Sequence, residues 1–279
     1  TQRAGASTAD RPTWPSLQDV RGRTREVVEA FRGHFRARGY QEHQPAPLVS
    51  HHDPSVRFIG STVSVIKPLL RSRMIPSSWV FLVQPALRSQ NLDLVADDSA
   101  QPRWCSYFLA PGLARPACKL QDTAADIWAL FRERLPVDPG RVVFRVSSQD
   151  VDLRAAIAAL QPPPEVEVDG YEEVRYRHRY GMPGVIGRNF NIAVRSSWGE
   201  LRDLGNLVLM EDRGEAIAVE FGTGVGTLLA WIHDLEHPIQ ASPIGTLVPI
   251  RDWRDVKLAD CLAAAVAILE EGVRPNAEQ

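Results

Sequence analysis

The hydrophobic positions of this chain follow a helical period near both ends. Val27, Val28, Phe31 and Phe35 recur every three or four residues, with polar side chains between them. This spacing predicts an amphipathic helix over 20–38 that ends near Gly39. A closing helix is predicted over 256–271. The pattern between these helices is extended and then helical over 56–70, and it is helical over 122–135, 150–160 and 227–237.

Compact apolar runs bounded by turn-forming residues predict the strands. They cover 79–83, 104–109, 141–146, 190–194, 204–211 and 216–221. The polar turn Asp212–Glu215 joins the last two runs and is typical of a β-hairpin. Because the chain combines hairpins with blocks of helices rather than a strict alternation, the order favours an α+β fold over a doubly wound sheet.

The 279 residues are enough to bury one large core. The polar start predicts a flexible N-terminal segment over 1–19, without the apolar stretch of a signal peptide. The main domain is predicted over 20–240. Residues 241–279 read as a proline-containing linker followed by the closing helix.

Composition narrows the classes of partner. The net charge of −2 gives no global positive field, which disfavours a protein that holds long stretches of nucleic acid. A local basic cluster lies between Arg175 and Arg188. No apolar run approaches the ~18 residues that span a bilayer. The cysteines at 105, 118 and 261 are too far apart for a zinc site, which predicts reduced thiols in a cytoplasmic protein.

The strongest local signal is the run Glu220–Leu229, in which Gly222, Gly224 and Gly226 alternate directly after a strand. Alternating glycines let a backbone approach a flat or anionic ligand. Nucleotide sites of this kind usually supply a charge one turn later, where this chain has Thr227, Leu228 and Leu229. A structural turn produces the same glycine run, so this alternative stays open.

Six segments of the chain occur in a specific order. They are Leu48–Phe58 followed by Lys67 and Pro68, Gln84–Asp93 with Arg88 at its centre, Gly181–Gly187, Gly205–Met210, the glycine run, and Leu258–Asp260 with Glu271–Asn276. In order and spacing they resemble the N-terminal catalytic domain of class II alanyl-tRNA synthetases. The first contains Asp-Pro-Ser at 53–55, the second resembles motif 2, and the glycine run falls where the family has motif 3.

The resemblance implies a class II fold, which is a mostly antiparallel sheet flanked by helices. It also implies ATP or an aminoacyl-adenylate as ligand and a small, alanine-like amino acid as substrate. Arg88 matches the motif 2 arginine, a catalytic residue that holds the carboxylate and the α-phosphate. The expected substrate-binding residues are Asn206, Val208, Glu220, Gly222 and His178. The expected nucleotide-binding residues are Arg88, Gly224, Gly226 and Tyr107.

The chain departs from the family around this site. Gly222 replaces the aspartate that anchors the substrate ammonium, and Glu220 lies two residues earlier, on the same side of a regular strand. Leu229 falls on the motif 3 arginine. Asn191 replaces an acidic residue and is a poor magnesium ligand, which leaves the use of magnesium open. The lysine-histidine pair of the family has no counterpart in Ser89–Asp93.

These departures lead to three hypotheses. The first is a synthetase-like protein working outside translation, which transfers an acyl group to a carrier protein or a small-molecule acceptor. The second is a transferase that takes its acyl group from charged tRNA, favoured by the cluster Arg175–Arg188 and disfavoured by the acidic pI. The third is a non-catalytic pseudo-synthetase that binds an amino acid or adenylate. Whether the protein is an enzyme therefore stays open.

No metal site is expected. His233 and His237 have a helical i, i+4 spacing, but no carboxylate pattern of a zinc hydrolase accompanies them. We interpret them as helix-surface or capping residues.

Overall fold

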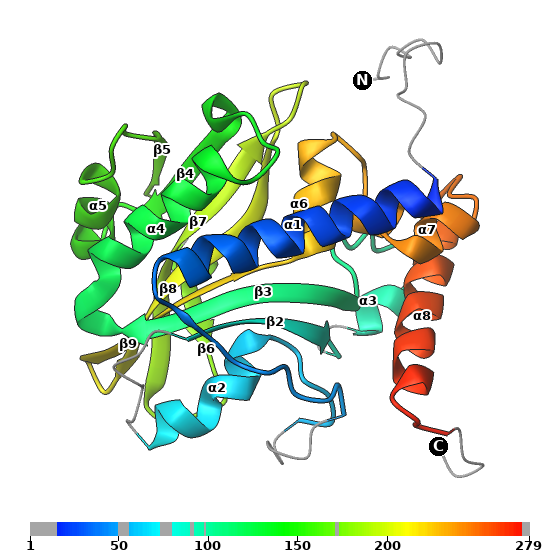
Figure 1. Cartoon of the computed structure of the whole chain (residues 1–279), viewed down its shortest axis with the longest axis horizontal. Helices are drawn as coiled ribbons and strands as arrows, with labels where there is room; N and C mark the ends of the chain where they lie inside the picture. Colours follow the sequence, from blue (N-terminus) through cyan, green and yellow to red (C-terminus); the bar gives the residue numbers. More distant parts are fainter. Residues whose placement is uncertain are drawn as a thin grey trace.

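The computed structural model describes residues 16–49, 56–72, 80–89, 92–97, 99–170 and 173–274 (Figure 1). Several sequence predictions lie outside these residues. They concern the N-terminal segment up to residue 15, the Asp-Pro-Ser element at 53–55, Trp79, Gln90, Asn91 and 275–276.

One nine-stranded sheet forms the centre of the described part. Its order is β1-β2-β3-β9-β8-β7-β4-β5, with β6 paired to β7. The strands are β1 (Gln41–Glu42), β2 (Val80–Leu87), β3 (Tyr107–Pro116), β4 (Val142–Ser147), β5 (Glu165–Asp169), β6 (Arg177–Arg179), β7 (Val185–Arg195), β8 (Leu201–Asp212) and β9 (Glu215–Thr223). In this spatial order every neighbouring pair between β2 and β4 is antiparallel, and the outer pairs β1–β2 and β4–β5 are parallel. The sheet therefore has the antiparallel character predicted from the sequence.

Helices flank this sheet on both sides. They are α1 (Leu17–Ala37), α2 (Thr62–Arg71), α3 (Leu92–Ala96), α4 (Leu120–Glu133), α5 (Val151–Ala158), α6 (Val225–Ile232), α7 (Pro243–Leu247) and α8 (Trp253–Glu270). Short 3-10 turns are found at Ala117–Lys119, Pro139–Arg141, Glu173–Tyr176 and Pro238–Ala241. Figure 1 shows α1 and α2 on opposite sides of the central strands.

The alternation of side chains along the strands produces two different faces. One face packs Leu113, Leu207, Phe190 and Phe221 against the apolar stripes of the helices, forming the large core. On the other face, α2 covers only a small cluster around Val63, Ala114, Val208 and Met210. Because α2 covers this face only in part, polar side chains of the central strands can reach a ligand there.

The hairpin and the main helices agree with the sequence predictions, with shifts of a few residues at their ends. The turn of the β8–β9 hairpin has Arg213 and Gly214 at positive φ, as a tight turn requires. The short strands β5 and β6 were not predicted, because β5 is mostly exposed and lacks an apolar run. The helix predicted over 227–237 is wrong at its end, since α6 stops at Ile232 and a 3-10 turn follows.

Candidate functional site

An open cleft of about 1540 Å³ lies along the polar face of the sheet and around the N-terminal end of α6. All nine residues predicted to bind substrate or nucleotide line it. They are Arg88, Tyr107, His178, Asn206, Val208, Glu220, Gly222, Gly224 and Gly226. Their roles stay predictions, but the fold brings these residues of five separate chain segments to one surface.

The register of the sheet explains why these side chains meet. Gly222 of β9 pairs with Asn206 of β8 and with Gly112 of β3. Two residues earlier, Glu220 pairs with Val208 and Ala114. No register shift separates these two rows, so Glu220 and Gly222 point to the same face, as the sequence predicted.

Glu220 is a carboxyl group enclosed by the protein and exposed by only 7%. The Tyr180 hydroxyl donates a hydrogen bond to its Oε2 at 3.2 Å, and Thr62 of α2 hydrogen-bonds to the same side chain. Burial raises the pKa of Glu220 to about 7, although both hydrogen bonds act in the opposite direction. The group is therefore poised between its charged and neutral forms near neutral pH.

The carboxyl group of Glu220 lies over Gly222, two residues further along β9. A methyl group at Gly222 would lie 3.8 Å from Glu220 Oε1 and 4.0 Å from Thr62 Oγ1. The side chain of an aspartate at 222 would point into this same space. Glu220 thus places a carboxyl oxygen beside Gly222, where the cleft floor has no side chain of its own.

Gly112 allows the contact between α2 and the sheet. A Cβ atom there would lie 2.4 Å from Thr62 Oγ1 and 2.8 Å from Thr62 Cβ. Only glycine lets Thr62 descend onto β3 and reach Glu220.

Arg88 is one of the cations that line the cleft, and it follows the end of β2. Its backbone N–H donates to the carbonyl of Ser106 at 2.8 Å, which fixes where the side chain starts. The guanidinium lies 5.8 Å from the ring centre of Phe108. It has no ion pair with any residue in the described ranges, and enclosure by the cleft lowers the pKa of Arg88. An arginine held in this way is available to an anionic ligand.

His178 and Asn206 form a second polar pair. Asn206 Nδ2 lies 3.2 Å from His178 Nε2. Burial is the main cause that lowers the pKa of His178, and the charge of Arg88 adds to it. A neutral His178 that accepts this hydrogen bond leaves the carbonyl oxygen of Asn206 free to accept one from a ligand.

The glycine run continues into α6, whose N-cap is Gly224. Thr227 faces the cleft, whereas Leu229 is 1% exposed and belongs to the large core. An arginine side chain starting from position 229 would point into apolar packing. The cleft-facing position one turn after the glycines is therefore Thr227, a neutral residue.

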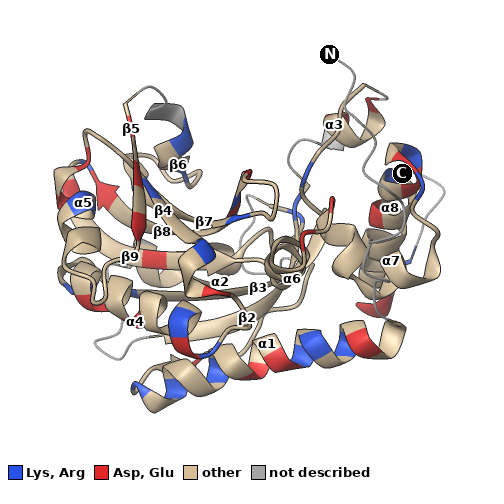
Figure 2. Ribbon diagram, turned by 90° about the horizontal axis from the view of Figure 1, so that it is seen from above, with Lys and Arg blue, Asp and Glu red and all other residues tan. Residues whose placement is uncertain are grey.

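Two arginines of the basic cluster predicted between Arg175 and Arg188 are paired with carboxylates. Arg177 is bound by Asp150 at 2.8 Å. Arg188 contacts Asp150, Asp152 and Glu211 at 2.6–3.1 Å, and these carboxylates raise its pKa. Strands β6 and β7 bring both arginines next to acidic residues that lie far away in the sequence. Figure 2 likewise shows both signs of charge interspersed over the ribbon.

His233 and His237 are both capping residues, as the sequence predicted. His233 is the C-cap of α6, and His237 caps the following 3-10 turn. In the part of the chain that the structure describes, no group of three or more His, Cys, Asp or Glu side chains is placed to hold a metal ion. Within the same part, no helix has the length and apolar character needed to cross a membrane.

Sequence reasoning missed three residues that shape the cleft: Thr62, Tyr180 and Trp104. Thr62 and Tyr180 act on Glu220 from positions that the six compared segments do not include. Trp104 was read only as the start of a strand. A single half-buried tryptophan carries no sequence signal that separates a ligand contact from core packing.

A scan against protein-family models gives no match for this chain, and a search of curated proteins also finds none. Solved structures do match. Apo histidyl-tRNA synthetase from S. aureus aligns with a TM-score of 0.51 at 8% identity, covering 84% of this chain and 75% of that one. Asparaginyl-tRNA synthetase from Pyrococcus horikoshii, complexed with asparaginyl-adenylate, gives 0.48 at 13% identity, covering 81% and 68%. The fold is that of class II aminoacyl-tRNA synthetase catalytic domains.

Proposed function

We propose that this protein binds a small amino acid as its adenylate and transfers the acyl group outside translation. The acceptor would be a carrier protein or a small molecule. The observation that carries the proposal is the placement of Glu220 Oε1 over Gly222, in the same cleft as Arg88, which has no ion pair among the described residues. A cation-binding and an anion-binding group on one glycine-lined floor match the two charged ends of an amino acid.

Each residue has a role in this proposal. Arg88 holds the carboxylate, and later the phosphate, by paired charge-assisted hydrogen bonds. Glu220 holds the ammonium group. Binding a cation favours the charged form of Glu220, so a ligand amine lowers its pKa from about 7. Asn206 accepts a further hydrogen bond from the amine.

The reaction needs positioning more than covalent chemistry from the protein. A carboxylate oxygen attacks the α-phosphorus of ATP, and pyrophosphate leaves. An acceptor nucleophile then attacks the acyl carbon and releases AMP. Arg88 stabilises the charge on phosphorus, and the walls of the cleft hold the reactants together.

A second function, binding without activation, is favoured by one specific observation. Thr227 and the buried Leu229 leave the phosphate end of the cleft without the cation that the family supplies there. A lost contact to developing phosphate charge costs about 3 kcal/mol. Such a protein would bind the adenylate as a sensor or take it from another enzyme.

Two measurements test these functions. Calorimetric titration with alanyl-sulfamoyl adenosine measures binding, and amino-acid-dependent exchange of pyrophosphate into ATP measures activation. Binding together with exchange supports the acyl-transfer function. Binding without exchange for any of the twenty amino acids supports the second function. Absence of binding by the folded protein refutes both.

Arg88→Ala is the variant that ties the measurement to the site. It is expected to weaken binding about tenfold or more, because a charge-assisted contact is lost. Arg134→Ala is the matched control, since Arg134 is an exposed arginine outside the cleft. Equal affinities of the two variants would argue against the assigned role of Arg88.

A further inference from the structure

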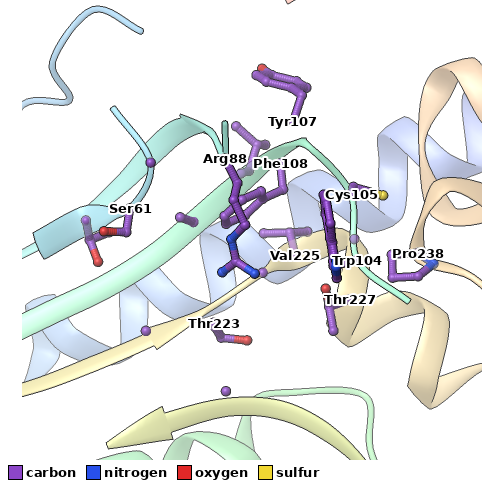
Figure 3. Close-up of a pocket in the computed structure, with 18 of the residues that line it drawn as sticks. Ser61, Arg88, Trp104, Cys105, Tyr107, Phe108, Thr223, Val225, Thr227 and Pro238 are labelled. Atoms are coloured by element: carbon purple, nitrogen blue, oxygen red, sulfur yellow. The ribbon is translucent and has the colours of Figure 1, made fainter. Parts of the chain in front are cut away.

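The cleft that holds Glu220 and Arg88 extends to the helices α1 and α7, which also line it. Figure 3 shows Arg88 projecting into the cleft, which Thr227 and Pro238 line as well. Pro238 begins the 3-10 turn on which α7 packs, and α7 in turn packs against α1. A molecule held between these two helices therefore has access to the charged groups of the site.

The part of the cleft formed by both helices, here called the α1–α7 rim, consists of five residues. They are Leu17, Arg21 and Arg25 of α1 and Ile244 and Leu247 of α7. The rim combines two cations with three apolar side chains.

The helix α1 supplies the cations of the rim. Arg21 and Arg25 are both exposed and lie one turn apart on the same side of the helix. Neither forms an ion pair with a residue in the described ranges, and the next carboxylate along this side, Glu29, is bound by Arg32 at 3.0 Å. Two like charges at i, i+4 destabilise a helix. The stability of α1 therefore does not explain the pair, whereas a partner that carries carboxylates does.

The helix α7 supplies apolar side chains next to these arginines. Leu247 is 64% exposed, and Ile244 and Leu17 are half-buried. An exposed leucine beside half-buried apolar side chains is a typical anchor point of a protein interface, with the charged residues at its border.

The position of α7 is fixed by two contacts. The hydroxyl of Ser242 caps the helix and accepts a hydrogen bond from the N–H of Gly245 at 3.0 Å. Gly245 also lies directly on the 3-10 turn, since a Cβ atom there would clash with the carbonyl oxygen of Ile239. Leu247, two residues further along, is therefore presented in one place rather than on a loose loop.

The side chains of the rim define the surface that fits them. A protein helix with apolar side chains and with carboxylates one turn apart is complementary to the rim in both respects. RNA fits less well, because none of the five rim residues is aromatic and only two of them are cations. The net charge of −2 also disfavours a polyanion.

We propose that the α1–α7 rim docks an acidic helix of the protein that receives the acyl group. This proposal rests on the proposed function and narrows its acceptor to a carrier protein. A flexible arm of the docked partner brings a nucleophile to the acyl-adenylate in the same cleft. The nucleophile forms a bond to the acyl carbon, and the bond between this carbon and the phosphate oxygen breaks. AMP leaves with the bonding electron pair, and the proton of the nucleophile passes to solvent.

Two synthetic peptides test the docking separately from the chemistry. Both are amphipathic helices with the same leucine positions, but one carries glutamates at i, i+4 and the other carries lysines there. Fluorescence anisotropy is expected to show that the acidic peptide binds more tightly than the basic one, and more weakly as the salt concentration rises. A single-stranded RNA with the same net charge as the acidic peptide is the third probe, and it is expected to bind more weakly than that peptide.

The double variant with Arg21→Glu and Arg25→Glu reverses the charge of the rim. It is expected to weaken binding of the acidic peptide about tenfold or more and to prefer the basic peptide. A merely structural role of the two arginines would not produce this exchange of preference. Leu247→Ser is expected to weaken binding of the acidic peptide about fivefold, because an apolar anchor is lost. The control Arg134→Glu changes an exposed arginine outside the cleft and is expected to keep the wild-type affinities.

Three outcomes would overturn the docking proposal. They are equal affinity for the two peptides, unchanged preference in the double variant, and tighter binding of the RNA than of the acidic peptide. A protein that binds alanyl-sulfamoyl adenosine but neither peptide would keep the proposed function and lose the docking surface. A protein that binds the acidic peptide but not the sulfamoyl adenosine would keep the docking surface and lose the proposed function.

Discussion

Glu220→Gln replaces one carboxyl oxygen of a buried side chain in the cleft by an amide nitrogen. In the folded protein the pKa of Glu220 is raised from 4.5 to about 7 by burial. A raised carboxyl pKa means that the folded state holds the proton more tightly than the unfolded state does. Its contribution to stability is therefore complete below pH 4.5 and is lost as the pH rises through 7.

The size of the effect follows from the two pKa values. Integrated between pH 5 and pH 8, the shift corresponds to a loss of about 2.5 kcal/mol in the free energy of unfolding. Glutamine does not titrate and keeps an oxygen that accepts from Tyr180 or Thr62. The wild type is therefore expected to lose about 2.5 kcal/mol more of its free energy of unfolding between pH 5 and pH 8 than the variant does.

Urea unfolding of both proteins at several pH values measures this difference directly, because all other titrating groups are shared. Glu26→Gln on the exposed face of α1 is the control, and its pH profile is expected to follow the wild type. The reasoning is refuted if the profiles of Glu220→Gln and the wild type run parallel from pH 5 to pH 8.

Three further substitutions probe the same face of the sheet. Gly222→Ala is expected to keep the wild-type melting temperature, since its methyl group meets no atom closer than 3.8 Å. It should also weaken binding of alanyl-sulfamoyl adenosine about tenfold, as calorimetry would measure. Gly112→Ala is expected to cost about 1–3 kcal/mol in urea unfolding, because it displaces Thr62; an unchanged midpoint would contradict the close contact. Asp260→Ala leaves two buried donors of Ser106 unpaired and is expected to cost about 1–3 kcal/mol. Hydrogen exchange at the Arg88 amide is expected to become faster, because this amide donates to the carbonyl of Ser106. Unchanged exchange would contradict the link from Asp260 through Ser106 to Arg88.

The sequence allowed the fold class to be predicted, and the residues predicted to bind a ligand all line one cleft. Periodicity indicated the β8–β9 hairpin, and a regular strand was enough to place Glu220 and Gly222 on one face. These predictions depend on residues close together in the chain, for which the repeat of the backbone determines which side chains share a face.

Other features depended on contacts between distant segments. The neutralisation of Arg188 requires Asp150 and Glu211, which only the folded sheet brings together. The two hydrogen bonds donated by Ser106 require Asp260, more than 150 residues further along the chain. Neither pairing leaves a pattern in one sequence, because the partners have no fixed spacing.

The burial of Leu229 also determines where a cation could be added to the cleft. An arginine at this position would place a charge among the side chains of the large core, which costs several kcal/mol if the charge stays unpaired. Such a substitution would therefore impair folding before it could bring a cation to the cleft. Position 227 is the better place, because its side chain already faces the cleft. A cation engineered beside the start of α6 is therefore expected to be tolerated at position 227 and not at position 229.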